Sequence, residues 1–260
     1  MKLGLVTYNL GKDWDVPTLI KHCAAAGFEG VELRSTHAHK VESTLSKAER
    51  AEVRKRFEDS PVELYGLGTA FDYHRPDPAE LKKHIEGTKE YVLLAADVGA
   101  MGVKVRPNGM PKEVDEAKTF EQIGTSYREV ARFGADHGIQ LWMEVHGRDT
   151  ADPRRMKRII DIADHPNARV CWNCNLRSKA DGGEIDESGS IAWGLDPLMD
   201  KIGEVHIHDL YDPYPYRELF GKLLGAGFSQ YTGVESPGSP DAARILKFYR
   251  ALWSKMILSA

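Results

Sequence analysis

Four segments of the chain repeat one pattern, in which a helical run ends near a glycine and an apolar, β-branched run follows. They are AAAGFEGVELR, LLAADVGAMGVKVR, GADHGIQLWMEV and LLGAGFSQYTGVE. Glycine suits the left-handed cap at the end of a helix, and β-branched apolar residues favour strands. The repeat therefore predicts helices that alternate with strands.

Eight short apolar runs are the predicted strands. They span residues 3–8, 30–34, 62–68, 102–106, 139–145, 169–173, 204–208 and 232–235. Amphipathic segments lie between most of them, and Ser46 with Glu49 predicts a capping box at the start of one. Strict alternation implies parallel strands joined by right-handed crossovers. Eight such units in 260 residues predict one α/β domain over residues 1–260, a single (β/α)8 TIM barrel. A doubly wound sheet is disfavoured because no GxGxxG turn follows the first strand.

Charge and hydropathy exclude several classes of partner. The formal net charge of -4 argues against nucleic acid bound through its phosphates. No apolar run approaches the roughly 20 residues of a membrane span. We therefore expect no nucleic-acid or membrane partner. We also expect a cytoplasmic location, with a leader removed from the chain as the alternative. Cys23, Cys171 and Cys174 form no disulfide framework and are expected to be structural.

The hexapeptide VHIHDL places two histidines on one face of a predicted strand. Side chains alternate across a strand, so Val205 and Ile207 point one way, and His206 and His208 point the other. Near the carboxyl ends of five other predicted strands, polar side chains again lie on the face opposite the aliphatic ones. The polar residues there are Glu32 and Arg34, Lys104 and Arg106, Glu144 and His146, Asn173, and Glu235.

Polar side chains at the carboxyl end of a barrel strand normally belong to a site. Several of them at one mouth would be costly to bury without a ligand or an ion. Glu144, His206 and Glu235 offer oxygen and nitrogen donors suited to one divalent ion, for which we expect Mn²⁺, with Mg²⁺, Co²⁺ or Zn²⁺ as alternatives. His146 and His208 lie nearer the mouth of the barrel. Each could act as a base, bind substrate, or hydrogen-bond to a ligand of the ion.

The chain resembles the xylose isomerase-like TIM barrels of the sugar phosphate isomerase/epimerase superfamily. The resemblance runs from GLVTYNLG through GFEGVELR, MEVHG, VHIHDL and GVES, effectively along the whole chain. Keto-sugar 3-epimerases, hydroxypyruvate isomerase and inosose dehydratase belong to that group, and endonuclease IV is a more distant relative. Each motif is short and weak by itself. Their order and spacing along the eight strand–helix units make the match specific.

The resemblance implies one ion held by Glu144, Asn173, His206 and Glu235. Asn173 departs from the family, which usually has aspartate there, so the ion would keep more positive charge or be bound less tightly. His146 or His208 could also complete the ligand set, and Asn173 could instead donate a hydrogen bond to substrate.

The activity implied is isomerisation or epimerisation of a keto-sugar, in which a proton next to the carbonyl is removed and an enediolate forms. Glu144 and Glu235 would be the acid–base pair, with His146 or His208 as a further base. We expect a small, neutral or weakly anionic carbohydrate, and a homo-oligomer is compatible with the sequence. The predicted substrate ligands are Glu32, His37, His39, Lys104 and Arg106.

Three alternatives stay open. A keto-sugar lyase or dehydratase could use the same enolate and the same residues. A phosphodiesterase like endonuclease IV would need a basic face and more carboxylate ligands. A sugar-binding barrel without catalysis would bind no metal or exchange no substrate proton.

Overall fold

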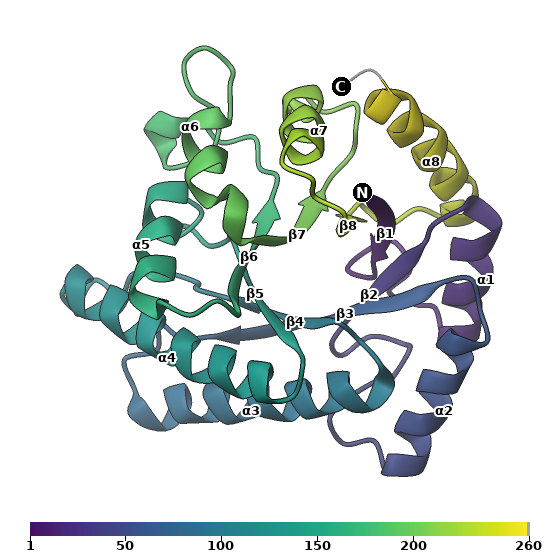
Figure 1. Cartoon of the computed structure of the whole chain (residues 1–260), viewed down its shortest axis with the longest axis horizontal. Helices are drawn as coiled ribbons and strands as arrows, with labels where there is room; N and C mark the ends of the chain where they lie inside the picture. Colours follow the sequence, from purple (N-terminus) through teal and green to yellow (C-terminus); the bar gives the residue numbers. More distant parts are fainter. Residues whose placement is uncertain (259–260) are drawn as a thin grey trace.

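The computed structural model describes residues 1–258, and eight parallel strands within them close into a barrel surrounded by helices (Figure 1). Neighbours in the chain are neighbours in the barrel, and β1 pairs with β8 to close it. The predicted (β/α)8 barrel is confirmed. The strands are β1 (Lys2–Val6), β2 (Gly30–Arg34), β3 (Glu63–Asp72), β4 (Gly102–Arg106), β5 (Gln140–Glu144), β6 (Ala168–Asn173), β7 (Ile202–Ile207) and β8 (Tyr231–Val234).

The helices follow the strands in strict alternation. They are α1 (Val16–Ala26), α2 (Lys47–Glu58), α3 (Pro78–Val98), α4 (Glu116–Asp136), α5 (Pro153–Ala163), α6 (Ala192–Leu195), α7 (Tyr216–Gly225) and α8 (Ala242–Leu258), with two 3-10 turns, η1 (Lys179–Asp181) and η2 (Asp196–Lys201), beside α6. None of these helices is both long and apolar enough to cross a membrane.

The glycines of the four repeated junctions end helices as expected. Gly27, Gly99, Gly138 and Gly227 all have φ between +71° and +81°, the left-handed region that side chains disfavour. The capping box of α2 is also present, because Ser46 accepts from the Glu49 N–H and the Glu49 carboxylate accepts from the Ser46 N–H. Local sequence therefore determines where these helices begin and end.

Several strand boundaries differ from those predicted. β7 spans Ile202–Ile207 where residues 204–208 were predicted, so His208 lies just after the strand. β1 ends at Val6, where its pairing with β2 ends, so Tyr8 lies in the following loop. β3 continues to Asp72, which pairs with Arg106 beyond a register shift. β8 ends at Val234, although the Glu235 N–H still donates to the Ile207 carbonyl. Each shift moves a side chain between a strand end and a loop at the mouth of the barrel.

Large aromatic side chains fill the amino-terminal half of the barrel. Tyr65 and Tyr231 stack with their ring centroids 4.1 Å apart, and Trp142 is buried in the same inner cluster. Glycines on neighbouring strands make room for them, since a Cβ at Gly102 would lie 2.4 Å from the Trp142 ring and one at Gly30 would lie 2.6 Å from Tyr231. The floor is therefore closed, and only the carboxyl-terminal half can hold a ligand.

The three cysteines are buried and free, in line with a structural role. Cys171 lies in the inner aromatic cluster, and Cys174 lies in the larger core between strands and helices.

Candidate active site

A layer of charged side chains lies above the aromatic floor. Glu32, Lys104, Glu144 and His206 come from β2, β4, β5 and β7, and each is at most 2% exposed. They point inwards because side chains alternate along each strand and the neighbouring apolar residues pack outwards against the helices. The charges must therefore be neutralised by one another or by something bound in the barrel.

Glu144 is held from three sides. Lys104 Nζ lies 2.7 Å and Arg106 Nε 3.1 Å from Oε2, while the Asn173 amide nitrogen donates to Oε1 at 2.7 Å. Burial opposes ionisation of this carboxyl, but Lys104 together with His206 holds the pKa of Glu144 well below its usual range. Glu144 is thus a fixed carboxylate.

The Nδ1 atom of His206 faces two carboxylates without a hydrogen bond. It lies 3.8 Å from Glu144 Oε1 and 3.6 Å from Glu235 Oε2, and it is buried without a partner. Two ligands about 2.1 Å from one ion at a tetrahedral angle would be about 3.4 Å apart. The orphaned nitrogen and the donor set therefore fit a divalent ion, and Glu144, His206 and Glu235 have ligand atoms within 4.8 Å of one another.

Asn173 joins this group to His208. Its Oδ1 lies 2.8 Å from His208 Nε2, and the other ring nitrogen of His208 lies 3.0 Å from the carbonyl oxygen of Glu235. In this orientation the amide nitrogen, not the oxygen, faces Glu144. Rotating the amide by half a turn would exchange the two atoms and present Oδ1 to the ion's position.

His146 presents one ring nitrogen to the cavity. Its Nδ1 lies 2.8 Å from Asn108 Oδ1, which can only accept, so Nδ1 carries the proton in a neutral ring. Among the described residues, Nε2 has no hydrogen-bond partner. Burial lowers the pKa of His146, despite the opposing charge of Glu144. The ring is therefore suited to accept a proton.

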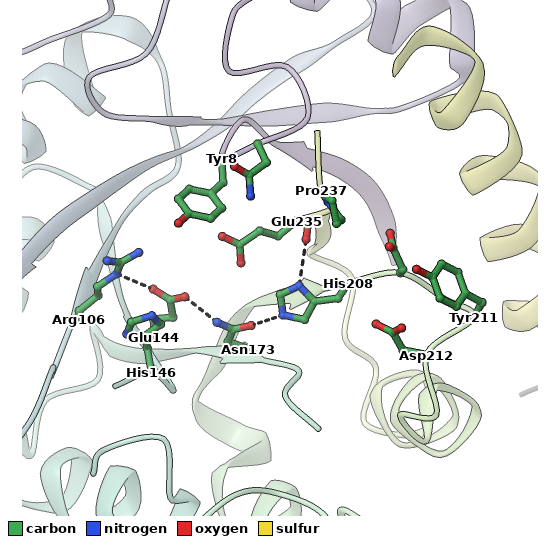
Figure 2. A pocket seen from close by; sticks show the side chains of 12 residues that line it. Tyr8, Arg106, Glu144, His146, Asn173, His208, Tyr211, Asp212, Glu235 and Pro237 are labelled. Atoms are coloured by element: carbon green, nitrogen blue, oxygen red, sulfur yellow. Dashed lines mark hydrogen bonds and ion pairs between the residues drawn. The ribbon is translucent and has the colours of Figure 1, made fainter. Parts of the chain in front are cut away.

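A cavity of about 760 Å³ opens above these groups. Figure 2 shows Glu144, His146 and Arg106 together on one side, and Glu235 and His208 on another. The predicted site residues that line it are Arg106, Glu144, His146, Asn173, His208 and Glu235. The loops after β1 and β7 add residues that the sequence reading did not assign to the site: Tyr8, Asn9, Asp209, Tyr211 and Asp212.

Five of the residues predicted to bind substrate or ion do not line this cavity. Glu32 and Lys104 are buried below it. His39 is tied to backbone, with Nε2 2.8 Å from the Arg34 carbonyl and Nδ1 accepting from the Val41 N–H, and His37 lies in the same loop. His206 also lies below the cavity lining, although its Nδ1 faces Glu235, which does line it.

Glu204 was missed by the sequence reading, although the signal was present. It precedes His206 by two positions on β7 and so shares its inward face. Glu204 Oε1 lies 3.4 Å from His206 Nε2, on the side away from the cavity, and Glu32 Oε2 lies 3.3 Å from the same nitrogen. Burial and the charge of Glu32 raise the pKa of Glu204 to about 8, whereas His206 outweighs burial and lowers the pKa of Glu32 to about 2.

Several solved structures share this fold. The D-psicose 3-epimerase of Clostridium cellulolyticum, solved with D-tagatose, is 15% identical, with 99% of each chain covered and a TM-score of 0.79. The probable 3-DHS dehydratase of Bacillus anthracis is 16% identical, with 98% of this chain and 99% of that chain covered and a TM-score of 0.76. The IolI protein, solved with a zinc atom, is 14% identical, with 100% and 97% covered and a TM-score of 0.73.

No curated protein matches the chain in sequence. The sequence model of one family does, and it matches residues 20–252, nearly the whole barrel. The match agrees with the closed eight-stranded barrel and with the structural neighbours, which include both epimerases and a dehydratase. The chain belongs to the family of xylose isomerase-like TIM barrels.

Proposed function

We propose that this protein is a divalent-metal-dependent isomerase or epimerase of a keto-sugar or sugar derivative. The observation that carries the proposal is the buried Nδ1 of His206, which faces the carboxylates of Glu144 and Glu235 below a polar cavity. A lone pair held between two carboxylates is unfavourable unless a proton or a metal cation lies among them, and a bound ion would take the place of the proton on Nδ1.

Glu144, His206 and Glu235 would hold the ion, with Asn173 as a fourth ligand after rotation of its amide. These oxygen and nitrogen donors suit Mn²⁺, and also Mg²⁺, Co²⁺ and Zn²⁺. When bound, the ion would supply positive charge to stabilise an enediolate. The structural neighbour solved with zinc supports a metal in this fold.

The acid–base chemistry would fall to Glu235 and His146. The Glu235 carboxylate lines the cavity, and no hydrogen bond to a described residue holds it, so it can reach a proton beside a substrate carbonyl. His146 offers its free Nε2 from another wall (Figure 2). Glu144 is clamped by Lys104 and Arg106, so we assign it to binding the ion more than to proton transfer.

The charges around the cavity favour a neutral sugar. Four carboxylates line it, those of Glu144, Asp209, Asp212 and Glu235, and Arg106 is its one arginine or lysine. A phosphate group would be repelled by most of this lining. Arg106 and His208 line the cavity and are the proposed substrate ligands. Glu32, Lys104, His37 and His39 do not line it, so we assign them no contact with substrate. Cytoplasmic location and homo-oligomerisation stay proposals from the sequence.

A lyase is the second candidate. His146 and His208 both line the cavity, and either imidazolium could protonate a hydroxyl group that leaves from an enolate. Elimination would then use the same first step, proton removal by Glu235, and differ only in the fate of the enolate.

Deuterium exchange tests the function directly. Keto-hexoses and keto-pentoses are incubated in D2O with protein loaded with Mn²⁺, and NMR follows the carbons beside the carbonyl. We expect metal-dependent deuterium at one of them, and the loss of about 99% or more of the exchange rate in Glu235→Gln, because both a ligand of the ion and the proton acceptor are gone. Deuterated epimer or isomer supports the first candidate, and a dehydrated product supports the lyase.

Buried Glu184 provides a matched control. It lies outside the lining of the cavity and bonds to Tyr214 and Asn175, so Glu184→Gln should keep the exchange rate. Absence of exchange with every keto-sugar, in protein shown to be fully metal-loaded, would overturn the enzymatic proposal and favour a sugar-binding barrel.

A further inference from the structure

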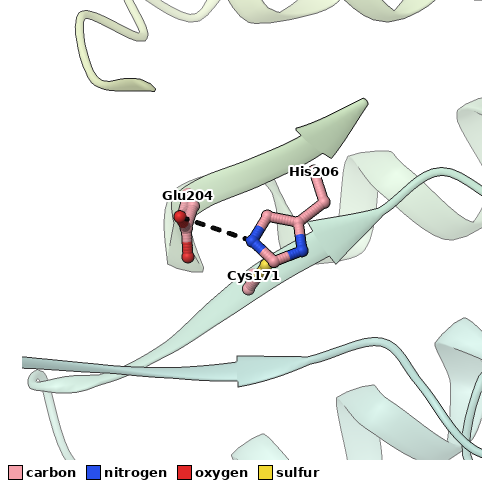
Figure 3. Close-up of side chains that lie close together, drawn as sticks. All are labelled: Cys171, Glu204 and His206. Carbon is pink, nitrogen blue, oxygen red and sulfur yellow. Dashed lines mark ion pairs between the residues drawn. The ribbon is translucent and has the colours of Figure 1, made fainter. Parts of the chain in front are cut away.

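The imidazole of His206 has carboxylates on both sides. Its Nδ1 faces Glu144 and Glu235, whereas Nε2 faces away from the cavity, 3.3 Å from Glu32 Oε2 and 3.4 Å from Glu204 Oε1. Figure 3 shows the ring beside Glu204, with Cys171 close to it. A neutral imidazole has a lone pair on only one of its two nitrogens, so only that nitrogen can bind an ion. The hydrogen bond made by the protonated nitrogen decides which one it is.

A carboxylate oxygen accepts hydrogen bonds and cannot donate them. With the Glu32 carboxylate as its hydrogen-bond partner at 3.3 Å, Nε2 of His206 is the nitrogen placed to carry the proton. In a neutral imidazole this leaves the lone pair on Nδ1, which is the buried nitrogen without a partner. We propose that Glu32 is a positioning residue that holds His206 in the Nε2–H form, so that Nδ1 is the atom presented to the divalent ion; this rests on the proposed function.

The barrel is built to hold the Glu32 carboxylate in this place. Glu32 is fully buried, and two glycines of β3 lie against it. A Cβ at Gly68 would lie 2.2 Å from Glu32 Oε1, and one at Gly66 would lie 3.4 Å from its Cγ. A side chain at Gly68 would displace the carboxylate from His206. Because Glu32 does not line the cavity, its effect on binding must pass through the His206 ring.

Carboxylates that orient metal-binding histidines have measurable effects. Their removal typically weakens metal binding by about 10- to 100-fold. In Glu32→Gln, the amide keeps the size of the side chain but loses the charge, and its NH2 group can donate to Nε2 and favour the wrong tautomer. We therefore expect the dissociation constant for Zn²⁺ to rise about 10- to 100-fold, with cooperative unfolding retained in the metal-free protein.

The first test is calorimetric titration of Zn²⁺ into wild type, Glu32→Gln and the buried control Glu184→Gln. The control should bind as wild type does, because Glu184 contacts neither His206 nor the cavity. Unchanged affinity in Glu32→Gln would overturn the positioning role while leaving the ion site intact. Unchanged affinity in Glu235→Gln and His206→Ala would instead overturn the proposed ion site.

The second test reads the tautomer itself and needs no variant of Glu32. In ¹⁵N-histidine-labelled wild type, NMR should show a proton on Nε2 and none on Nδ1 of His206, both with Zn²⁺ bound and in metal-free protein at a pH where the ring is neutral. His206→Gln assigns the signals by their loss. A proton on Nδ1 of the neutral ring would overturn the proposal even if Glu32→Gln fails to fold.

Discussion

Asn173 lies between the two parts of the candidate site, with one amide atom towards Glu144 and the other towards His208. An aspartate there would place a second carboxylate against Glu144 Oε1. Two like charges at hydrogen-bonding distance are unfavourable without a cation between them. The amide therefore lets the metal-free site form without this repulsion.

Asn173→Asp should make the protein more dependent on its ion. The carboxylate adds a full charge against the cation, so we expect the metal dissociation constant to fall about tenfold or more. Metal-free protein should unfold at a lower temperature because of the repulsion with Glu144. Activity at saturating metal should also fall, since a more neutral ion stabilises an enolate less well.

Asn175→Asp is the matched control for this substitution. The Asn175 amide also donates to a buried glutamate, Glu184, at 2.8 Å, but outside the ion cluster. The metal affinity of Asn175→Asp should equal that of wild type. If Asn173→Asp also leaves metal affinity unchanged, the amide is not a ligand, and a hydrogen bond to substrate becomes the better account.

Site residues could be predicted where the alternation of side chains along a strand was enough to place them on its inner face. Glu144, His206 and Glu235 follow from parity and from their places at strand ends. The role of Lys104 could not be predicted in this way, because its ammonium could equally have faced substrate. Only the packing of β4 against β5 shows that the Lys104 ammonium pairs with Glu144.

At the scale of elements, short strands and glycines decide what the barrel can contain. β2, β4 and β7 each carry glycine at an inner position beside an aromatic ring of another strand. The missing side chains make room for Trp142 and Tyr231, which close the floor. The charged layer is therefore pushed towards the mouth.

Gly102→Ala should destabilise β4 and the floor. The new Cβ would lie 2.4 Å from the Trp142 ring, a buried group with no free space beside it. Overpacking of this kind costs about 1–3 kcal/mol. The midpoint of urea unfolding should fall accordingly.

Gly225→Ala is the control, because nothing lies within 4 Å of a Cβ at that position in α7. Removing a helical glycine should leave stability unchanged or raise it by up to about 1 kcal/mol. Equal stability of Gly102→Ala and wild type would show that the floor can rearrange and does not fix the depth of the site.

In the proposed site, ion binding is coupled to folding of the whole barrel. The proposed ligands come from β5, β7 and the end of β8, so the site exists only when the barrel is closed. A ligand that binds only folded protein stabilises it by about 2.7 kcal/mol at a concentration 100 times its dissociation constant. For a domain of this size we expect a rise in Tm on the order of 5 °C or more.

Thermal unfolding with increasing Mn²⁺, followed by circular dichroism, measures this coupling. Glu235→Gln and His206→Ala should unfold cooperatively but lose the Mn²⁺-dependent rise, and EDTA should abolish it in wild type. Elemental analysis should find about one divalent ion per wild-type chain, a fraction of that in either variant, and full occupancy in Glu184→Gln. Full metal content in either ligand variant would contradict the assignment.

The sequence by itself determined the barrel, the order and approximate position of its elements, and which side chains face inwards. Helix caps and strand alternation are local, with periods of a few residues, so Gly27, Ser46 and the pair His206 and His208 could be interpreted without tertiary information. Tertiary structure decided which inward groups meet. Glu32 and Glu204 flank the same nitrogen across 172 positions of sequence, and the loop of His37 and His39 turns away from the cavity. Such contacts depend on barrel closure, strand stagger and loop path, and no local pattern specifies them.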